Sequence, residues 1–336
     1  MRLSGPRSLA ALAPALAIAL AAQPQASPSI STVFQLSDSP TWFENLAIRS
    51  SGEILATRVD VPELWAVDPF TKSGSRLLSV PEVTALLGIT EVYPDVFAFV
   101  GTNFSIATGI QPNSSQIWEL DLRGRSPVSR LAAKLPQAGL LNGADTWNSS
   151  SILVADSTLA QILLVDINTG QSAVAISDPT MTVPPNSTHP IGPNGVKVFR
   201  SARDRTTYVY YTSMAQALFC RVPVSAQTAA PTGPVEVIAS GFTMDDFTLL
   251  EDGSALVAAN TDNTIVKVTL DGTVTTVAGS AGSLDLATAT ACRFGRTARD
   301  SRVLYVTTTG GATQPVNGTL TRPANIAAVD FAACGW

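Results

Sequence analysis

The chain has 336 residues, of which 45% are hydrophobic and 14% are charged, and its formal net charge at pH 7 is −5. With 21 Lys and Arg residues against 26 Asp and Glu residues, it lacks the basic face that nucleic acid requires, so nucleic acid is excluded as a partner. A chain this apolar buries a large core, either as two domains or as one large all-β domain. No Pro/Ser-rich linker divides residues 27–336, which favours a single domain.

The first 26 residues are organised as a secretory signal peptide. Arg2 and Arg7 form a basic start, an apolar run extends from Leu9 to Ala22, and small residues precede Ser27. The apolar run is shorter than the roughly 20 residues that a membrane-spanning helix needs. We therefore expect residues 1–26 to be removed and the mature protein to be secreted, or held in the lumen of the secretory pathway, without membrane attachment.

Two further features agree with export. Five asparagines in N-x-S/T sequons are predicted glycosylation sites: Asn103, Asn113, Asn148, Asn186 and Asn317. Three cysteines permit one disulfide and leave one thiol over, and a bond between Cys292 and Cys334 is favoured because it would fix the C-terminal end. The chain has no CxxC pair and a single histidine, which excludes a zinc centre built from Cys and His ligands.

Short runs of aliphatic, β-branched and aromatic residues alternate with Gly, Asp, Asn and Ser turns along the rest of the chain. Only residues 80–87 and 283–291 have the pattern of short helices. A phrase of turn, strand, turn and strand recurs at 51–69, 95–122, 149–170, 206–224 and 252–272, and again at 300–311 with 325–331. Units of roughly 45 to 50 residues lie in the range of propeller blades. The sequence thus predicts an all-β, six-bladed β-propeller over residues 27–336; a pair of β-sandwiches would not produce the repeated phrase.

Each unit is preceded by one more short strand, predicted at 47–48, 94–96, 143–146, 196–199, 247–250 and 293–295, and we expect these strands to line the central channel. At the start of four of them stands a pair of residues whose first member has an oxygen-bearing side chain and whose second member is Asn, Asp or Gly. The pairs are Glu44-Asn45, Asn142-Gly143, Asn194-Gly195 and Asp245-Asp246. A single Asn-Gly pair is more often a turn. The shared register of all four predicts that their side chains converge at one mouth of the channel. Carboxylate and amide oxygens suit Ca²⁺ or Mg²⁺.

Several segments carry a family resemblance: FENLAIRSSGEILAT, LNGAD, PNGVKV, DDFTLLEDGSALVA, CRFGR and LYVTTTGG. Together they resemble the gluconolactonase/senescence-marker-protein family of six-bladed β-propellers, over nearly the whole mature chain. The resemblance implies a divalent metal held at the channel mouth by Glu44, Asn194 and Asp245, with Asn142 at a neighbouring position that faces the substrate.

Two departures from the family pattern point to a particular branch. The usual E-G-P is E-N-L at 44–46, and the usual P-D-G is M-D-D at 244–246, so it stays open whether Asp245 or Asp246 faces the channel. With the secretion signal, these variants resemble a divergent fungal branch that includes hetero-Diels–Alderases. Such enzymes join an o-quinone methide to the alkene of a terpene.

Two activities therefore compete for one pocket that takes a small molecule. As a cyclase the protein would need no cofactor and would hold a terpenoid or polyketide-derived pair in a reactive pose, with Asn194, Asp246 and His189 donating hydrogen bonds to the quinone-methide oxygen. As a lactonase it would use Ca²⁺ or a similar cation to polarise a lactone, with Asn142 and Asn194 positioning it and Asp245, Asp246 or His189 activating water. We favour the cyclase; a non-catalytic small-molecule-binding propeller is a third alternative. The oligomeric state is not indicated.

Other side chains are weaker candidates. Trp42, Phe43, Tyr93 and Trp147 lie near the predicted mouth and could pack against a terpene, although each alone is more often part of a blade core. Arg293 and Arg296 could hold an anionic substrate, although ion pairs with carboxylates of the blades are the more common role.

Overall fold

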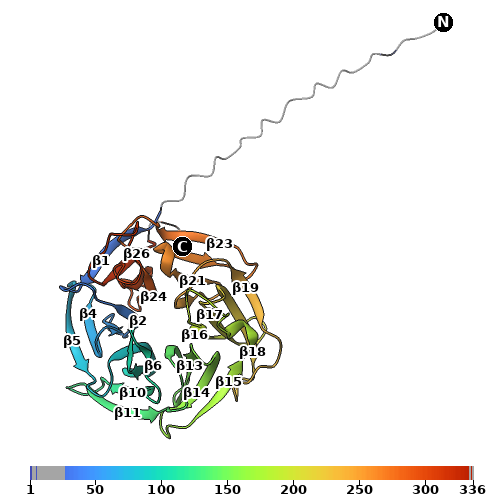
Figure 1. The fold of residues 1–336 in the computed structure, drawn as a ribbon. Helices are drawn as coiled ribbons and strands as arrows, with labels where there is room; N and C mark the ends of the chain where they lie inside the picture. The colour runs from blue at the N-terminus through green and yellow to red at the C-terminus, as the bar shows by residue number, and fades with distance from the viewer. Residues whose placement is uncertain (2–4, 6–26, 333, 335–336) are drawn as a thin grey trace.

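Six four-stranded antiparallel sheets form a ring around a central axis in the computed structural model, which describes Met1, Gly5, residues 27–332 and Cys334 (Figure 1). The predicted six-bladed β-propeller is confirmed. The signal peptide predicted at 1–26 lies outside the described residues, apart from Met1 and Gly5. Within the described part of the chain, no helix is both long and apolar enough to span a membrane.

The four strands of each blade succeed one another from the channel outward. Blade 1 consists of β2 (Phe43–Ile48), β3 (Ile54–Arg58), β4 (Glu63–Asp68) and β5 (Ser73–Ser79); blade 2 consists of β6 (Ala85–Tyr93), β7 (Val96–Thr102), β10 (Gln116–Asp121) and β11 (Val128–Lys134). Blade 3 consists of β12 (Leu141–Asn148), β13 (Ser151–Asp156), β14 (Gln161–Asp166) and β15 (Ser172–Ser177); blade 4 consists of β16 (Pro193–Arg200), β17 (Thr207–Ser213), β18 (Leu218–Val224) and β19 (Glu236–Ser240). Blade 5 consists of β20 (Phe247–Leu249), β21 (Ala255–Ala259), β22 (Thr264–Val268) and β23 (Val274–Gly279); blade 6 consists of β24 (Ala289–Phe294), β25 (Val303–Thr308), β26 (Asn325–Asp330) and β1 (Ser29–Gln35).

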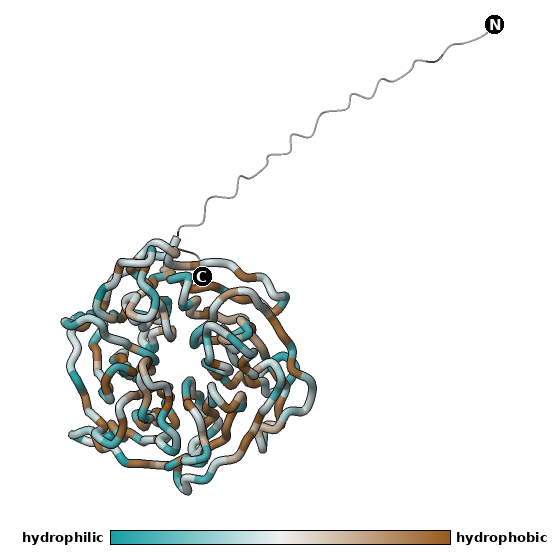
Figure 2. Tube along the Cα trace, in the orientation of Figure 1, coloured by the Kyte–Doolittle hydropathy of each residue, from teal (hydrophilic) through white to brown (hydrophobic). Residues whose placement is uncertain are grey.

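The hydrophobic core is divided among the interfaces between neighbouring blades. Each of the six clusters of buried apolar residues combines side chains from two consecutive sheets, including the pair formed by blades 6 and 1. Strands β3, β7, β13 and β21 are buried along their whole length, because a neighbouring sheet covers each of their faces. Figure 2 shows the hydrophobic residues running along the strands, whereas hydrophilic residues dominate the peripheral loops.

The ring is closed by a strand from the opposite end of the chain. β1 pairs antiparallel with β26, from Ser29 opposite Asp330 to Gln35 opposite Asn325, so the two ends of the propeller share one sheet (Figure 1). In the other five blades the outermost strand follows the third strand along the chain, but blade 6 differs. Its outermost strand precedes the first blade, and no local pattern connects the two.

Removing this closing strand should destabilise the whole ring. A chain that begins at residue 37 would leave β26 without its outer partner and would expose the core that Val33, itself 5% exposed, covers in the full chain. We expect thermal unfolding at least 10 °C below that of a chain beginning at residue 27, on the basis that about 1 kcal/mol shifts Tm by roughly 2–4 °C at this size. Equal melting temperatures in calorimetry would contradict closure by β1.

Three predicted elements were wrong. Residues 80–87 and 283–291 are not helices: they lead into the inner strands β6 and β24, and the helical turns of the described residues are two 3₁₀ segments, Pro179–Met181 and Asn260–Asp262. The inner strand of blade 2 is β6 rather than residues 94–96, which comprise the turn after it and the first residue of β7. β6 is buried on both faces and its apolar run is nearly continuous, a pattern that periodicity does not distinguish from a buried helix.

The predicted disulfide is also corrected. Cys292 on β24 is a buried free thiol, so the Cys292–Cys334 bond is not formed. Its Sγ donates to the carbonyl of Leu256, 3.3 Å away, and burial raises its pKa to about 12. Cys292 and Cys334 pack in the same cluster between blades 5 and 6, where Cys292 serves as a small apolar side chain.

The five sequon asparagines lie outside the core, and their glycosylation stays a prediction. Four are exposed (Asn113, Asn148, Asn186 and Asn317) and Asn103 is half-buried.

Candidate functional site

An irregularity interrupts the inner strands at one height around the ring. In five of them the pairing with the second strand shifts, between Phe43 and Leu46, Leu86 and Ile89, Leu141 and Ala144, Pro193 and Val196, and Ala289 and Ala291. A bulge of this kind redirects consecutive side chains. In blade 5, Asp245 and Asp246 lie directly before β20 and both pair with Ala258 on β21. The Asp245 amide donates to the Ala258 carbonyl (2.9 Å), and the Ala258 amide donates to the Asp246 carbonyl (3.0 Å).

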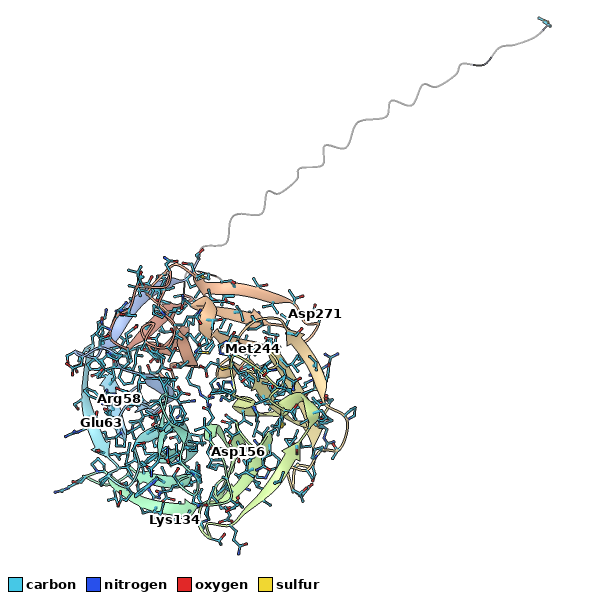
Figure 3. The ribbon with its side chains drawn as sticks, in the orientation of Figure 1. Arg58, Glu63, Lys134, Asp156, Met244 and Asp271 are labelled. Atoms are coloured by element: carbon cyan, nitrogen blue, oxygen red, sulfur yellow. The ribbon has the colours of Figure 1, made fainter. Side chains whose placement is uncertain are left out.

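In five of the six blades, the first of the two consecutive residues at this height lines a single cavity of about 640 Å³ at one mouth of the channel. Glu44, Leu87, Asn142, Asn194 and Asp245 line it, each from a different blade. The structure therefore brings together all four residues that the family resemblance placed there: Glu44, Asn142, Asn194 and Asp245. Figure 3 places Met244, directly before Asp245, on the inner side of the ring, whereas Lys134 and Asp271 lie at its periphery.

The rest of the cavity wall is largely apolar. Val59, Leu140 and Met214 continue the wall, together with Trp42. The rim is formed by the β8–β9 hairpin (Phe104–Ser105 and Gly109–Ile110), by residues 188–191 and by residues 312–314. A buried polar floor under apolar walls suits a ligand with an oxygen-bearing head and a hydrocarbon body.

Burial sets the protonation of the two carboxyl groups on the floor. Glu44 Oε2 accepts a hydrogen bond from Trp42 Nε1 (2.6 Å), yet desolvation raises the pKa of Glu44 to about 7. Asp245 Oδ2 accepts one from Asn260 Nδ2 (2.7 Å), while desolvation and then the charge of Glu44 raise its pKa well above the ordinary value. In the absence of a cation, the raised pKa of Asp245 favours its neutral carboxylic acid form, which can donate a hydrogen bond.

Three oxygen atoms on this floor have no hydrogen-bond partner within the described part of the chain: Oδ1 of Asn142, of Asn194 and of Asp245. A buried polar atom left unpaired costs about 1–3 kcal/mol. Because all three belong to residues that line one cavity, they mark it as a place where a ligand or an ion completes the hydrogen bonding.

The second residue of each pair lies deeper, at the waist of the channel. Asp246 forms an ion pair there with Lys197, and its Oδ2 accepts from Asn45 Nδ2 (2.8 Å). Lys197 is only 2% exposed and also donates to the carbonyl of Val196 (2.9 Å). Asp245 therefore faces the cavity. The expectation that Asp246 acts there is corrected, because its carboxylate is engaged by Lys197 and Asn45 beneath the floor.

Glycines allow the inner strands to meet at this waist. A Cβ on Gly88 would lie 2.3 Å from the carbonyl oxygen of Asn142, and one on Gly143 would lie 2.5 Å from that of Asn194. A Cβ on Gly195 would lie 2.6 Å from Asp246 Oδ1. The two Asn-Gly pairs thus serve the close approach of neighbouring strands rather than tight turns.

Gly143→Ala tests this packing. The methyl group would meet backbone that can move only by separating blades 3 and 4, so we expect a loss of about 1–3 kcal/mol of unfolding free energy, the typical cost of overpacking. Gly124→Ala is the matched control, because its Cβ would have only the Ser126 carbonyl oxygen nearby, at 3.7 Å. Equal urea midpoints for the two variants would show that the waist is not tightly packed.

The remaining predicted residues are dispersed. His189 lies half-buried on the rim of the cavity. Trp42 lines the cavity, whereas Phe43 and Trp147 belong to blade cores and Tyr93 is 54% exposed. Arg293 and Arg296 lie at the other end of the channel, paired with Asp145 and Glu91.

Several residues that line the site were not predicted from the sequence, among them Leu87 and Asn260. Leu87 was missed because its strand was misplaced, and Asn260 was missed because nothing in the sequence links the turn after β21 to Asp245.

No protein-family model matches the chain. A protein of Phoma sp named "Putative hetero-Diels-Alderase" is 28% identical over 305 residues, which cover 80% of this chain and 83% of that protein. "Putative hetero-Diels-Alderase asR5" of Sarocladium schorii is 26% identical over 313 residues, with 80% and 75% covered.

Solved structures share the fold. The calcium-binding protein regucalcin from Agrobacterium tumefaciens superposes with a TM-score of 0.61 at 16% identity, covering 91% of this chain and 93% of regucalcin. A luciferin-regenerating enzyme superposes with a TM-score of 0.64 at 12% identity, covering 90% and 95%. The resemblance found in the sequence is confirmed: both curated relatives carry the name "Putative hetero-Diels-Alderase", and the structural neighbours include a regucalcin propeller.

Proposed function

We propose that this chain is a biosynthetic cyclase of the hetero-Diels–Alderase type, which joins an o-quinone methide to the alkene of a terpene. The names of its two curated relatives support the reaction class. The observation that carries the proposal is the cavity itself, in which the buried Asp245 carboxyl group lies on the floor of an otherwise largely apolar enclosure and has a raised pKa.

The reaction needs a pose and a hydrogen bond more than it needs a cofactor. The C=C–C=O unit of the quinone methide and the C=C bond of the alkene form one C–C bond and one C–O bond, and no proton, electron or leaving group is gained or lost. When the C–C bond forms ahead of the C–O bond, negative charge collects on the quinone-methide oxygen. A donor fixed beside that oxygen stabilises the transition state more than the ground state.

The floor supplies such a donor. Asn260 holds Oδ2 of Asp245, which leaves Oδ1 as the atom without a partner in the described structure. A proton on Oδ1 can be donated to the substrate oxygen, with the amide groups of Asn142 and Asn194 beside it. Leu87 and Met214 on the wall confine the hydrocarbon partner, so that two molecules meet in one alignment.

A specific observation also favours the lactonase. The unpaired oxygens of Asn142, Asn194 and Asp245, with the Glu44 carboxylate, are hard donors that fit Ca²⁺. No group of three or more His, Cys, Asp and Glu side chains in the described residues is placed to hold a metal, so a cation here would depend on the two amide oxygens. Bound there, it would polarise a lactone carbonyl, and both carboxyl groups would have to ionise.

One experiment separates the two activities. Mature protein, dialysed against a chelator, is incubated with an o-quinone methide released in situ and a cyclic sesquiterpene alkene, and chiral chromatography follows the dihydropyran product. We expect one stereoisomer, formed faster than with heat-denatured protein and equally fast without chelator. Hydrolysis of aryl or sugar lactones that needs Ca²⁺, without any cyclisation, would overturn the proposal.

A further inference from the structure

The channel has a second hollow at its opposite mouth. Because the inner strands are the first strands of their blades and all run in one direction, their C-terminal ends meet away from the large cavity. There, β2, β6, β12 and β24 enclose a cleft of about 220 Å³. The waist formed by Lys197, Asp246 and the glycines stands between the two hollows.

The acidic groups of this cleft are already engaged. Glu91 Oε1 accepts from the Asp95 amide (2.9 Å), and its Oε2 accepts from Arg296. Asp145 Oδ2 accepts from the Val198 amide (2.8 Å).

The two threonine hydroxyl groups of the cleft also donate their protons within the protein. Thr146 donates to the Glu91 carbonyl (2.7 Å), so in its 2.9 Å contact with Thr90 the latter is the donor. Neither acids nor hydroxyl groups have a proton to offer a ligand.

The arginines, in contrast, retain unused donors. Arg293 is the less satisfied: its nearest carboxylate oxygen, Asp145 Oδ1, is 3.7 Å from Nη2, beyond hydrogen-bond distance, and its side chain is 24% exposed. Arg296 uses Nη1 for the Ile48 carbonyl (2.8 Å) and for Glu91, which leaves Nε and Nη2 unassigned among the described residues. The unused hydrogen-bond donors of the cleft, among the described residues, are therefore guanidinium N–H groups.

The unused guanidinium donors favour a ligand with a carboxylate group. A planar guanidinium matches a carboxylate through two parallel hydrogen bonds. Ala47, Ile89 and Phe294 add an apolar wall, and the volume lies below the roughly 300–1,000 Å³ of pockets that take drug-sized molecules. We propose that this cleft binds a small monocarboxylate with an apolar or aromatic body, and that Arg293 holds its carboxylate group with help from Arg296.

Benzoate is the probe, and benzamide is its neutral counterpart. Titration calorimetry on the full mature chain should show benzoate binding at least tenfold more tightly than benzamide. Arg293→Gln should weaken benzoate binding at least tenfold, and Arg293→Lys should weaken it less, because it keeps the charge but loses the paired hydrogen bonds. Arg130→Gln is the matched control, since Arg130 pairs with Glu119 on the outer strands of blade 2.

Three results would overturn the site: equal affinity for benzoate and benzamide, unchanged benzoate binding in Arg293→Gln, or loss of binding in an Asp245→Leu variant, which would place benzoate in the large cavity. If Arg293→Gln does not fold, Arg296→Gln and Arg293→Lys carry the same test, and unchanged affinity in both would refute it. The outcome does not depend on cyclisation, so the failure of either proposal leaves the other intact.

Discussion

Replacing Asp245 with leucine is expected to slow cyclisation about 100-fold or more, the usual cost of removing one positioned donor from a developing oxyanion. Leucine fills the position with an apolar side chain but offers no hydrogen-bond donor on the cavity floor. Asp245→Asn keeps an N–H donor and should retain more of the rate than Asp245→Leu. The measurement is the single-turnover rate of dihydropyran formation, together with the ratio of its stereoisomers.

The matched control is Asp271→Asn, a residue at the periphery of the ring (Figure 3), which should leave rate and stereochemistry unchanged. If Asp245→Leu and Asp245→Asn lose the same fraction of the rate, Asp245 acts as a charged ligand or as a structural group rather than as a donor. If neither variant loses rate, the cavity works by confinement alone.

Stability should fall as the pH rises through the range in which Glu44 loses its proton. The folded protein holds that proton up to about pH 7, whereas an unfolded chain releases it near 4.5. Between these values the folded state binds more protons, so the free energy of unfolding decreases with rising pH, by about 3 kcal/mol for a shift of this size. Asp245, whose pKa is also raised, adds to the same trend. Urea unfolding of chelator-treated protein from pH 4.5 to 8 measures it.

Glu44→Gln removes the group and should flatten this dependence. The exposed Glu82 provides the control, because Glu82→Gln changes the same functional group outside the cavity. A stability that rises between pH 5 and 7 in the wild-type protein would contradict a proton held on the floor. Saturating Ca²⁺ is a separate arm: a large stabilisation above pH 7 that Glu44→Gln abolishes would support the metal-dependent alternative.

Asp245 and Asp246 are adjacent in the sequence but lie in different parts of the channel, Asp245 at the large cavity and Asp246 at the waist. Asp245 lines the cavity and has no hydrogen-bond partner at Oδ1 among the described residues, whereas its neighbour Asp246 accepts hydrogen bonds from Lys197 and Asn45 beneath the cavity floor. In our proposal Asp245 supplies the hydrogen bond to the substrate, and Asp246 holds together the strands that position it. Substituting Asp246 would therefore report on the packing of the waist before it reported on the reaction.

Much of the fold and part of the site follow from local sequence. Turn residues and β-branched runs repeat with the length of a blade, and this spacing is sufficient for six sheets in a ring. The register of Glu44, Asn142, Asn194 and Asp245 is visible because each stands at the start of an inner strand. The inner strand of blade 2 could not be placed from the sequence, because a strand buried on both faces has no alternation of apolar and polar residues.

The six blades and the ring of oxygen-bearing side chains can be deduced from the sequence alone, because both are encoded within a few neighbouring positions. Four other features required the three-dimensional arrangement: β1 closes blade 6, Cys292 stays reduced, Asn260 holds Asp245, and Asp246 turns away toward Lys197. Each of these depends on a partner that is distant in the sequence, mostly from another blade or from the far end of the chain. Strand pairing, packing and hydrogen bonds between distant segments decide these features, and no local pattern records them.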